Sequence, residues 1–197
     1  MTSLYLVRHG EIDRKWQGRY LGDRDVPLRK DAISQLVLLA EVLAGEGAGH
    51  LVTSNLVRCQ RSAAAIATII RLKPEIEPRF KEISLGKWDG QNQNTVKKKQ
   101  PQLYLRRGNN LWQFRTPQGE SFTQVGKRAE FAARGYLRRF TKTIIVTHAG
   151  VIRALLCKLA EHSFAETMKI KIPYGSCIVL EQDTEGIIRY TKKIIVG

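Results

Sequence analysis

Short apolar runs and segments of helical periodicity alternate along most of this chain. Apolar runs typical of buried strands cover residues 4–7, 51–53 and 143–147, with a fainter one at 75–80. Helical spacing predicts four longer helices, at about 30–44, from a cap at Ser54 or Asn55 to about 72, at about 121–139 and at 151–160. This alternation predicts an α/β fold, a three-layer α/β/α sandwich around a mostly parallel sheet.

Two regions depart from the alternation. The strand-like segments 176–181 and 187–195 flank a short turn, Asp183–Gly186, which predicts an antiparallel strand at one edge of the sheet. The segment from about 84 to 120 is polar and rich in Lys, Gln and Asn, and we expect one or two short helices over a sheet edge, acting as a partial lid. Because 197 residues suit one domain, we expect residues 1–197 to form a single domain with this insertion.

The charge balance is strongly basic, with 33 Lys and Arg against 18 Asp and Glu and a formal net charge of +15. The positive residues are spread along the chain. The one basic run, Lys97–Lys99, has no interleaved aromatic residues, so we do not expect nucleic acid as a partner. A basic surface also suits an enzyme that attracts small phosphate esters. The composition leaves a homodimer open.

The sequence contains no pattern typical of a metal site, a disulfide framework or a membrane-spanning segment. Cys59, Cys157 and Cys177 are odd in number and far apart, with no C-x-x-C pair, so we expect neither a disulfide framework nor a zinc site. We expect no metal and no cofactor. No run approaches the roughly 20 apolar residues of a membrane-spanning helix. The first residues enter a strand-like run with no leader pattern, so we expect a cytoplasmic protein without a membrane partner.

Polar groups follow three of the expected strands at the point where each strand ends. They are Arg8-His9-Gly10, the stretch Ser54–Arg58, and His148-Ala149-Gly150. Ligands of open α/β sheets bind outside the carboxyl ends of the strands, and helix N-termini and arginines favour anions. A single histidine after a strand is more often structural than catalytic. Three such groups on one edge, with small residues that let a ligand approach, predict a pocket for a tetrahedral dianion.

Six motifs carry a resemblance to a known family and occur in that family's order. They are Leu6–Glu11, Gly18–Leu28, Thr53–Arg58, Lys81–Gly90, Gly119–Phe122 and Val146–Arg153. Over nearly its whole length the chain resembles the histidine phosphatase superfamily, in its phosphoglycerate-mutase-like group.

The resemblance implies a role for each matching residue. His9 would attack phosphorus in line and carry the phosphoryl group. Arg8, Arg58 and His148 would hold its oxygens, and Glu82 would protonate the leaving oxygen and later deprotonate the attacking water. The other expected contacts of substrate or phosphate are Lys15, Arg19 and Gly150.

Three positions differ from the family's usual residues. Ile12 stands where Thr or Ser is usual, Lys15 where Asn is frequent, and Arg61 where Gln is usual. None of them removes the chemical groups named above. They bear on the substrate pocket, because they replace a hydroxyl or an amide by an apolar group or a charge.

Within the family we expect a phosphatase. The phosphoglycerate mutases it resembles carry a longer insertion that shields the phosphohistidine from water, whereas the insertion here is short. The segments Gly18–Leu28 and Val146–Arg153 most resemble α-ribazole phosphatases, which act late in cobalamin assembly, so α-ribazole 5′-phosphate is the expected small-molecule substrate. The alternatives are a phosphoglycerate mutase, a sugar-phosphate phosphatase, or a non-catalytic anion- or nucleic-acid-binding protein on the same fold.

Overall fold

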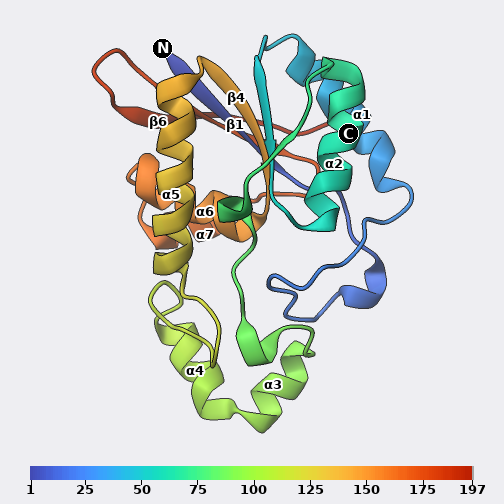
Figure 1. Ribbon diagram of the computed structural model, residues 1–197. Helices are drawn as coiled ribbons and strands as arrows, with labels where there is room; N and C mark the ends of the chain where they lie inside the picture. Colours follow the sequence, from blue (N-terminus) through green and yellow to red (C-terminus); the bar gives the residue numbers. More distant parts are fainter. Residues whose placement is uncertain (197) are drawn as a thin grey trace.

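One mixed sheet runs through the centre of the molecule (Figure 1). The computed structural model describes residues 1–196. Within them the strand order is β3-β2-β4-β1-β5-β6. The strands are β1 (Thr2–Arg8), β2 (His50–Thr53), β3 (Glu75–Ile76), β4 (Lys142–Thr147), β5 (Cys177–Gln182) and β6 (Ile188–Ile194). The predicted α/β class is confirmed.

Seven α-helices and three short 3-10 turns complete the described part of the chain. The helices are α1 (Ala32–Ala44), α2 (Val57–Ile70), α3 (Gln93–Lys99), α4 (Pro101–Asn109), α5 (Phe122–Arg139), α6 (Ala149–Leu159) and α7 (Phe164–Lys169). The 3-10 turns are η1 (Arg14–Trp16), η2 (Pro78–Phe80) and η3 (Gly86–Trp88).

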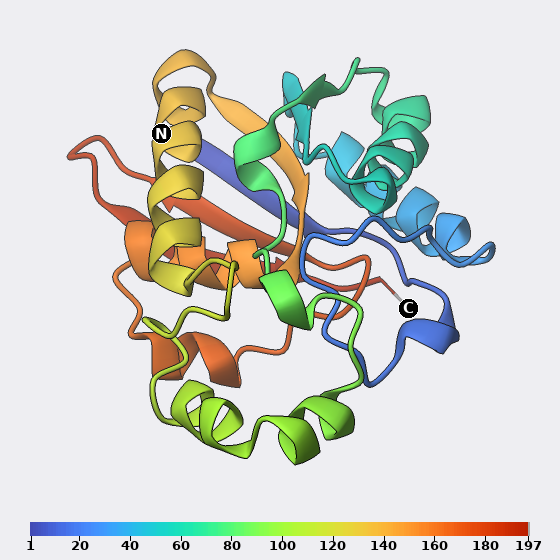
Figure 2. The same ribbon diagram turned by 60° about the horizontal axis from the view of Figure 1, so that its bottom comes forward.

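Both faces of the sheet are buried, as the continuous apolar run of β1 requires. Successive residues of a strand point to opposite faces. Leu4 and Leu6 accordingly pack in a core with residues of α5 and α6, whereas Tyr5 and Val7 pack in a second core with α1 and α2. Figure 2 shows these helices on the two sides of the sheet. Two cores flanking one sheet make the three-layer sandwich.

The sheet is mostly parallel, as predicted, and its antiparallel pairings lie at one edge. β1 pairs in parallel with β4, and β4 with β2, but β5 pairs antiparallel with β1, and β6 antiparallel with β5. β5 is therefore the strand that runs against the others, and β6 forms the edge beside it. The expected strand at 75–80 is short, because Pro78 cannot donate a ladder hydrogen bond and begins η2.

The insertion forms two short helices beyond the carboxyl ends of the parallel strands, and not over a sheet edge as expected (Figure 1). Asn92 caps α3 by accepting from two backbone N–H groups, and Pro101 begins α4. Trp88 anchors the segment, because it is fully buried and its indole Nε1 donates to Gln100 at 2.9 Å.

Helix α7 was missing from the predicted elements. Ser163 and Glu166 form a capping box at its start, in which each side chain bonds the other residue's backbone N–H. The S-x-x-E pattern in the sequence is the known signature of this cap, and it would have indicated the helix.

Candidate functional site

His9 lies just after β1, 5% exposed, and its backbone N–H continues the parallel ladder by donating to the carbonyl of Thr147 at 3.0 Å. Its Nδ1 is 2.8 Å from the carbonyl oxygen of Gly10. A carbonyl only accepts, so Nδ1 carries the proton and Nε2 keeps its lone pair. Burial, and then the charges of Arg58 and Arg8, lower the pKa of His9 well below its usual value. The imidazole is therefore neutral and can act as a nucleophile through Nε2.

Arg58 comes from the first turn of α2 and is almost fully buried. Its Nη1 and Nη2 donate to the carbonyls of Arg24 and Gly22 at 2.8 and 3.1 Å, and its Nε donates to Nδ1 of His148 at 3.3 Å. A guanidinium has five N–H donors, so two remain beyond these three for a ligand. The carbonyls fix the side chain, and the ring of His148 aligns it.

His148 follows β4 and is completely buried. Its Nδ1 accepts from Arg58, so the proton is on Nε2, which lies 3.0 Å from Oγ of Ser54. Burial first, and then Arg58, lower its pKa well below the usual value. The rings of His9 and His148 meet edge to face, with centroids 5.1 Å apart. Two neutral imidazoles thus lie side by side between arginines.

Ser54 is not the helix cap that the sequence predicted. Helix α2 begins at Val57 with Leu56 at the N-cap position and no side-chain cap. Ser54 accepts from the N–H of Leu56 at 3.3 Å, and the same hydroxyl lies against His148. Its role at the site was not recognised, because a serine before a helix is normally explained as a cap.

Arg8 points toward the segment that leads into β5. Its Nη1 donates to the carbonyl of Ile172 at 2.6 Å, and its guanidinium lies 3.6 Å from the ring centre of Tyr174. Its Nε is buried without a hydrogen-bond partner among residues 1–196. Buried donors are normally paired, so an oxygen of a bound anion would complete this one. Tyr174 is also 5.5 Å from the ring of His9, centre to centre.

Glu82 reaches the same centre from the loop after η2. Its carboxylate accepts from the backbone N–H of Ile83 at 3.0 Å and of Gly150 at 3.3 Å. A β-carbon on residue 150 would lie 2.3 Å from Oε1 of Glu82. A side chain on residue 150 would therefore displace the Glu82 carboxylate, and the expected contact of Gly150 with the ligand stays a prediction.

Arg128 of α5 holds the backbone that carries Glu82, and sequence reasoning missed it. Its guanidinium donates to the carbonyls of Arg79 and Lys81 at 2.7 and 2.8 Å, and to that of Glu82 at 3.2 Å. It also forms an ion pair with Glu120, whose carboxylate accepts from the N–H of Ser84 at 3.0 Å. Helical periodicity marks Arg128 only as a polar residue of an amphipathic helix, so the sequence held no signal for this contact.

Lys15 and Arg19 lie apart from this cluster. They line a cavity of about 400 Å³ with Trp16, Arg24 and Gly90. The Lys15 side chain is 65% exposed and lies 3.5 Å from the carboxylate of Asp13. Of the family departures, Ile12 is buried and bridges to Leu28, while Arg61 is exposed. Ile12 is thus explained as a core residue.

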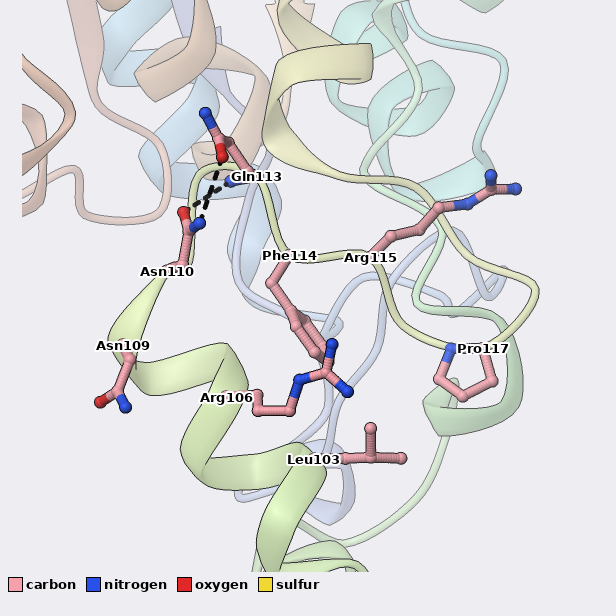
Figure 3. Close-up of a pocket in the computed structure, with 8 residues that line it drawn as sticks. All are labelled: Leu103, Arg106, Asn109, Asn110, Gln113, Phe114, Arg115 and Pro117. Atoms are coloured by element: carbon pink, nitrogen blue, oxygen red, sulfur yellow. Dashed lines mark hydrogen bonds between the residues drawn. The ribbon is translucent and has the colours of Figure 1, made fainter.

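A larger cavity of about 630 Å³ lies between α4 and the segment that follows it (Figure 3). Asn110 and Gln113 hydrogen-bond to each other on its wall, and Arg106 and Arg115 line it. None of the strand-end residues belongs to it. This cavity is therefore distinct from the place where the candidate catalytic groups meet.

Two further properties bear on the chemistry. In residues 1–196 no three His, Cys, Asp or Glu side chains are grouped as metal ligands would be. Over the same residues, no helix is both long and apolar enough to cross a membrane.

Comparisons with known proteins bear on the family and the fold of this chain. A relative from Yersinia pestis, described as a probable phosphoglycerate mutase GpmB, is 30% identical over 161 residues, which cover 81% of this chain and 75% of that protein. The solved structure of Bacillus stearothermophilus YhfR is 25% identical with a TM-score of 0.85, covering 100% of this chain and 98% of that one. A putative α-ribazole-5′-P phosphatase from Escherichia coli shares the fold at 23% identity, with a TM-score of 0.84 and coverage of 100% and 96%.

The family assignment rests on nearly the entire chain. Residues 4–191 match the description of the histidine phosphatase superfamily, branch 1. This range contains all the strand-end groups and the insertion. The chain belongs to the histidine phosphatase superfamily, a family of phosphatases and mutases.

Proposed function

We propose that this protein is a phosphomonoesterase that works through a phosphohistidine at His9. The observation that carries the proposal is a buried, neutral imidazole whose unprotonated Nε2 lies among two arginines and a second histidine. Arg8 and Arg58 both retain N–H donors beyond their described contacts, which suits a tetrahedral anion.

In the first step, Nε2 of His9 attacks phosphorus and a P–N bond forms. The ester P–O bond breaks as the carboxyl group of Glu82 gives its proton to the leaving oxygen, so an alcohol departs. The arginines balance the charge on the equatorial oxygens through the transition state.

In the second step, water attacks the phosphohistidine. The Glu82 carboxylate takes a proton from this water, the P–N bond breaks, and inorganic phosphate leaves. His9 returns to its neutral form with Nδ1 still bonded to the carbonyl of Gly10.

Hydrolysis is favoured over mutase chemistry by the insertion. Its helices span only 7 and 9 residues, and α4 has no fully buried side chain. Such a cover excludes water poorly, so water should reach the phosphohistidine. A mutase reaction is the second candidate, since the Yersinia relative is described as a probable mutase.

The substrate is a small phosphorylated metabolite, and α-ribazole 5′-phosphate is the first ester to test. The support is the resemblance of Gly18–Leu28 and Val146–Arg153 to α-ribazole phosphatases, together with the fold shared with the Escherichia coli protein. Sugar phosphates and phosphoglycerate belong in the same panel.

Rapid quenching with labelled ester tests the mechanism. We expect an acid-labile, base-stable phosphoenzyme that is absent from His9→Ala. Near wild-type turnover by His9→Ala would overturn the mechanism. Exchange of label between two phosphoglycerates without release of phosphate would favour the mutase, and absence of turnover on every ester would favour a binding protein.

A further inference from the structure

A tight turn over residues 173–176 leads into β5. The N–H of Ser176 donates to the carbonyl of Pro173 at 3.3 Å, and its hydroxyl donates to the same carbonyl at 2.7 Å. Gly175 has a φ of +63°, in the left-handed region that favours glycine. A β-carbon on residue 175 would also lie 2.7 Å from Oε1 of Gln35 in α1. The turn therefore has a defined conformation, which fixes the direction of its second residue, Tyr174.

This turn is bonded to the backbone of the candidate nucleophile. The N–H of Gly175 lies 3.2 Å from the carbonyl oxygens of both Arg8 and His9, and the N–H of Arg8 donates to the carbonyl of Ser176 at 2.9 Å. Because hydrogen bonds run in both directions between the two segments, the turn cannot move far without displacing the end of β1. Tyr174 is therefore held at a fixed place beside the site.

The ring of Tyr174 lies against the guanidinium of Arg8. The central carbon of the guanidinium is 3.6 Å from the ring centre, which is van der Waals contact and well inside the limit of about 6 Å for a cation–π interaction. Nη1 of the same guanidinium donates to the carbonyl of Ile172 at 2.6 Å. One contact fixes an edge of the guanidinium and the other fixes its face. The buried Nε, which has no partner within residues 1–196, thereby keeps one direction.

The same ring lies beside the imidazole of His9. The two ring centres are 5.5 Å apart and the planes are tilted by 47°, within the separation of about 4.5–7 Å at which aromatic rings interact. The charge of Arg8 is one of the causes that lower the pKa of His9. The place of this guanidinium therefore bears on two properties at once, the binding of an anion and the protonation of the nucleophile.

We propose that Tyr174 is a positioning residue for the reaction at His9, and that its aromatic face holds the guanidinium of Arg8 ready for the phosphoryl oxygens. This inference rests on the proposed function, because it takes Arg8 to bind those oxygens. A free arginine side chain loses rotamer entropy when it binds an anion. An arginine already held in place loses less, so it binds the anion more tightly and stabilises the transition state without reorganising. The role needs the ring of Tyr174 and not its hydroxyl.

Calorimetric titration with inorganic phosphate tests this role without requiring turnover. Tyr174→Leu removes the aromatic face and should weaken phosphate binding about tenfold, as expected for the loss of a desolvated cation–π contact. Tyr174→Phe keeps the ring and should bind phosphate within about twofold of the wild type. Tyr190→Leu, at a half-buried tyrosine of β6, is the control for the loss of a tyrosine's packing and should leave the phosphate affinity unchanged.

A double-mutant cycle with Arg8→Gln determines whether Tyr174 acts through this arginine. In the Arg8→Gln protein, Tyr174→Leu should change the phosphate affinity by less than about twofold. Tyr174→Leu alone should also make phosphoenzyme formation fall at a higher pH than in the wild type, because displacing the charge of Arg8 raises the pKa of His9. A residue that only stabilised the fold would give additive losses of affinity and leave the pH dependence unchanged.

The outcomes separate this inference from the proposed function. Additive losses in the cycle, or a loss in Tyr174→Phe equal to that in Tyr174→Leu, would refute the role of the ring. If no ester is hydrolysed but phosphate binding depends on Tyr174 and Arg8 as described, the proposed function fails and the positioning of Arg8 stands. If esters are hydrolysed through His9 but Tyr174→Leu matches Tyr190→Leu in phosphate affinity and pH dependence, the proposed function stands and this inference is wrong.

Discussion

The carboxylate of Glu82 occupies the space where a β-carbon on residue 150 would lie, and the N–H of Gly150 donates to it. Replacing Gly150 by Ala should displace Glu82 and remove its proton transfer, which is typically worth about 10² to 10⁴ in rate. We expect a loss in this range for phosphoenzyme formation from alkyl esters, measured in a single turnover. Gly135→Ala is the control, because a β-carbon there meets no atom within 4 Å. A Gly150→Ala protein with the wild-type rate would show that Glu82 need not be where the structure has it.

Glu82→Gln should distinguish between leaving groups. An alkoxide leaves poorly without a proton, whereas p-nitrophenolate is stable as an anion. The burst of phosphoenzyme formation should slow by about 10² to 10⁴ for alkyl esters and far less for p-nitrophenyl phosphate. Steady-state rates cannot serve, because the same residue acts as base in the water step. If Glu82→Gln slows the burst equally for both esters, Glu82 is not the proton donor. Glu11 and Glu120 would then be tested next.

Arg128→Met should lower both stability and catalysis, because it leaves Glu120 unpaired and releases the backbone at 79–82. Breaking a buried ion pair costs about 3–5 kcal/mol, and this partly exposed pair should lie at or below the lower end. Arg134→Met removes the exposed pair with Glu130 from the same helix and should cost under about 1 kcal/mol. Chemical denaturation measures the loss of unfolding free energy in each of the two variants. As a positioning residue for Glu82, Arg128 should affect kcat on alkyl esters more than on p-nitrophenyl phosphate, and an equal effect would contradict that role.

The rate of phosphoenzyme formation should stay constant as pH falls through 6.5. A free imidazole would become protonated there and lose its nucleophilic lone pair, but burial and two arginines hold the pKa of His9 well below that value. Stopped-flow bursts at saturating p-nitrophenyl phosphate between pH 8 and pH 5 test this. Arg8→Gln removes one of the positive charges that lower the pKa of His9. In this variant the rate of phosphoenzyme formation should therefore begin to fall at a higher pH than in the wild type. If the wild-type rate instead falls with a midpoint near pH 6.5, His9 titrates normally and this prediction is wrong.

The sequence predicted the sheet and the three strand-end groups because these depend on local pattern, whereas the role of Glu82 came from the family resemblance. Buried strands such as 143–147 are marked by β-branched runs, and the residues after them fall on one edge by topology. Tyr174, Arg128 and Ser54 act through contacts between distant segments, which no local pattern encodes. Lys15 and Arg19 were expected to contact substrate or phosphate, and the structure has them lining a separate cavity, which only side-chain directions show.

The strand order has a consequence for how this protein acquires its shape. β1 is synthesised first, yet it lies between β4 and β5, and both come from the last third of the chain. Its two hydrogen-bonding edges stay unpaired until those residues have left the ribosome, and unpaired edges can join other chains. Pairings across such sequence separations also form slowly. His9 therefore gains its neighbours late, and we expect truncated chains that end before β4 to aggregate instead of forming a partial enzyme.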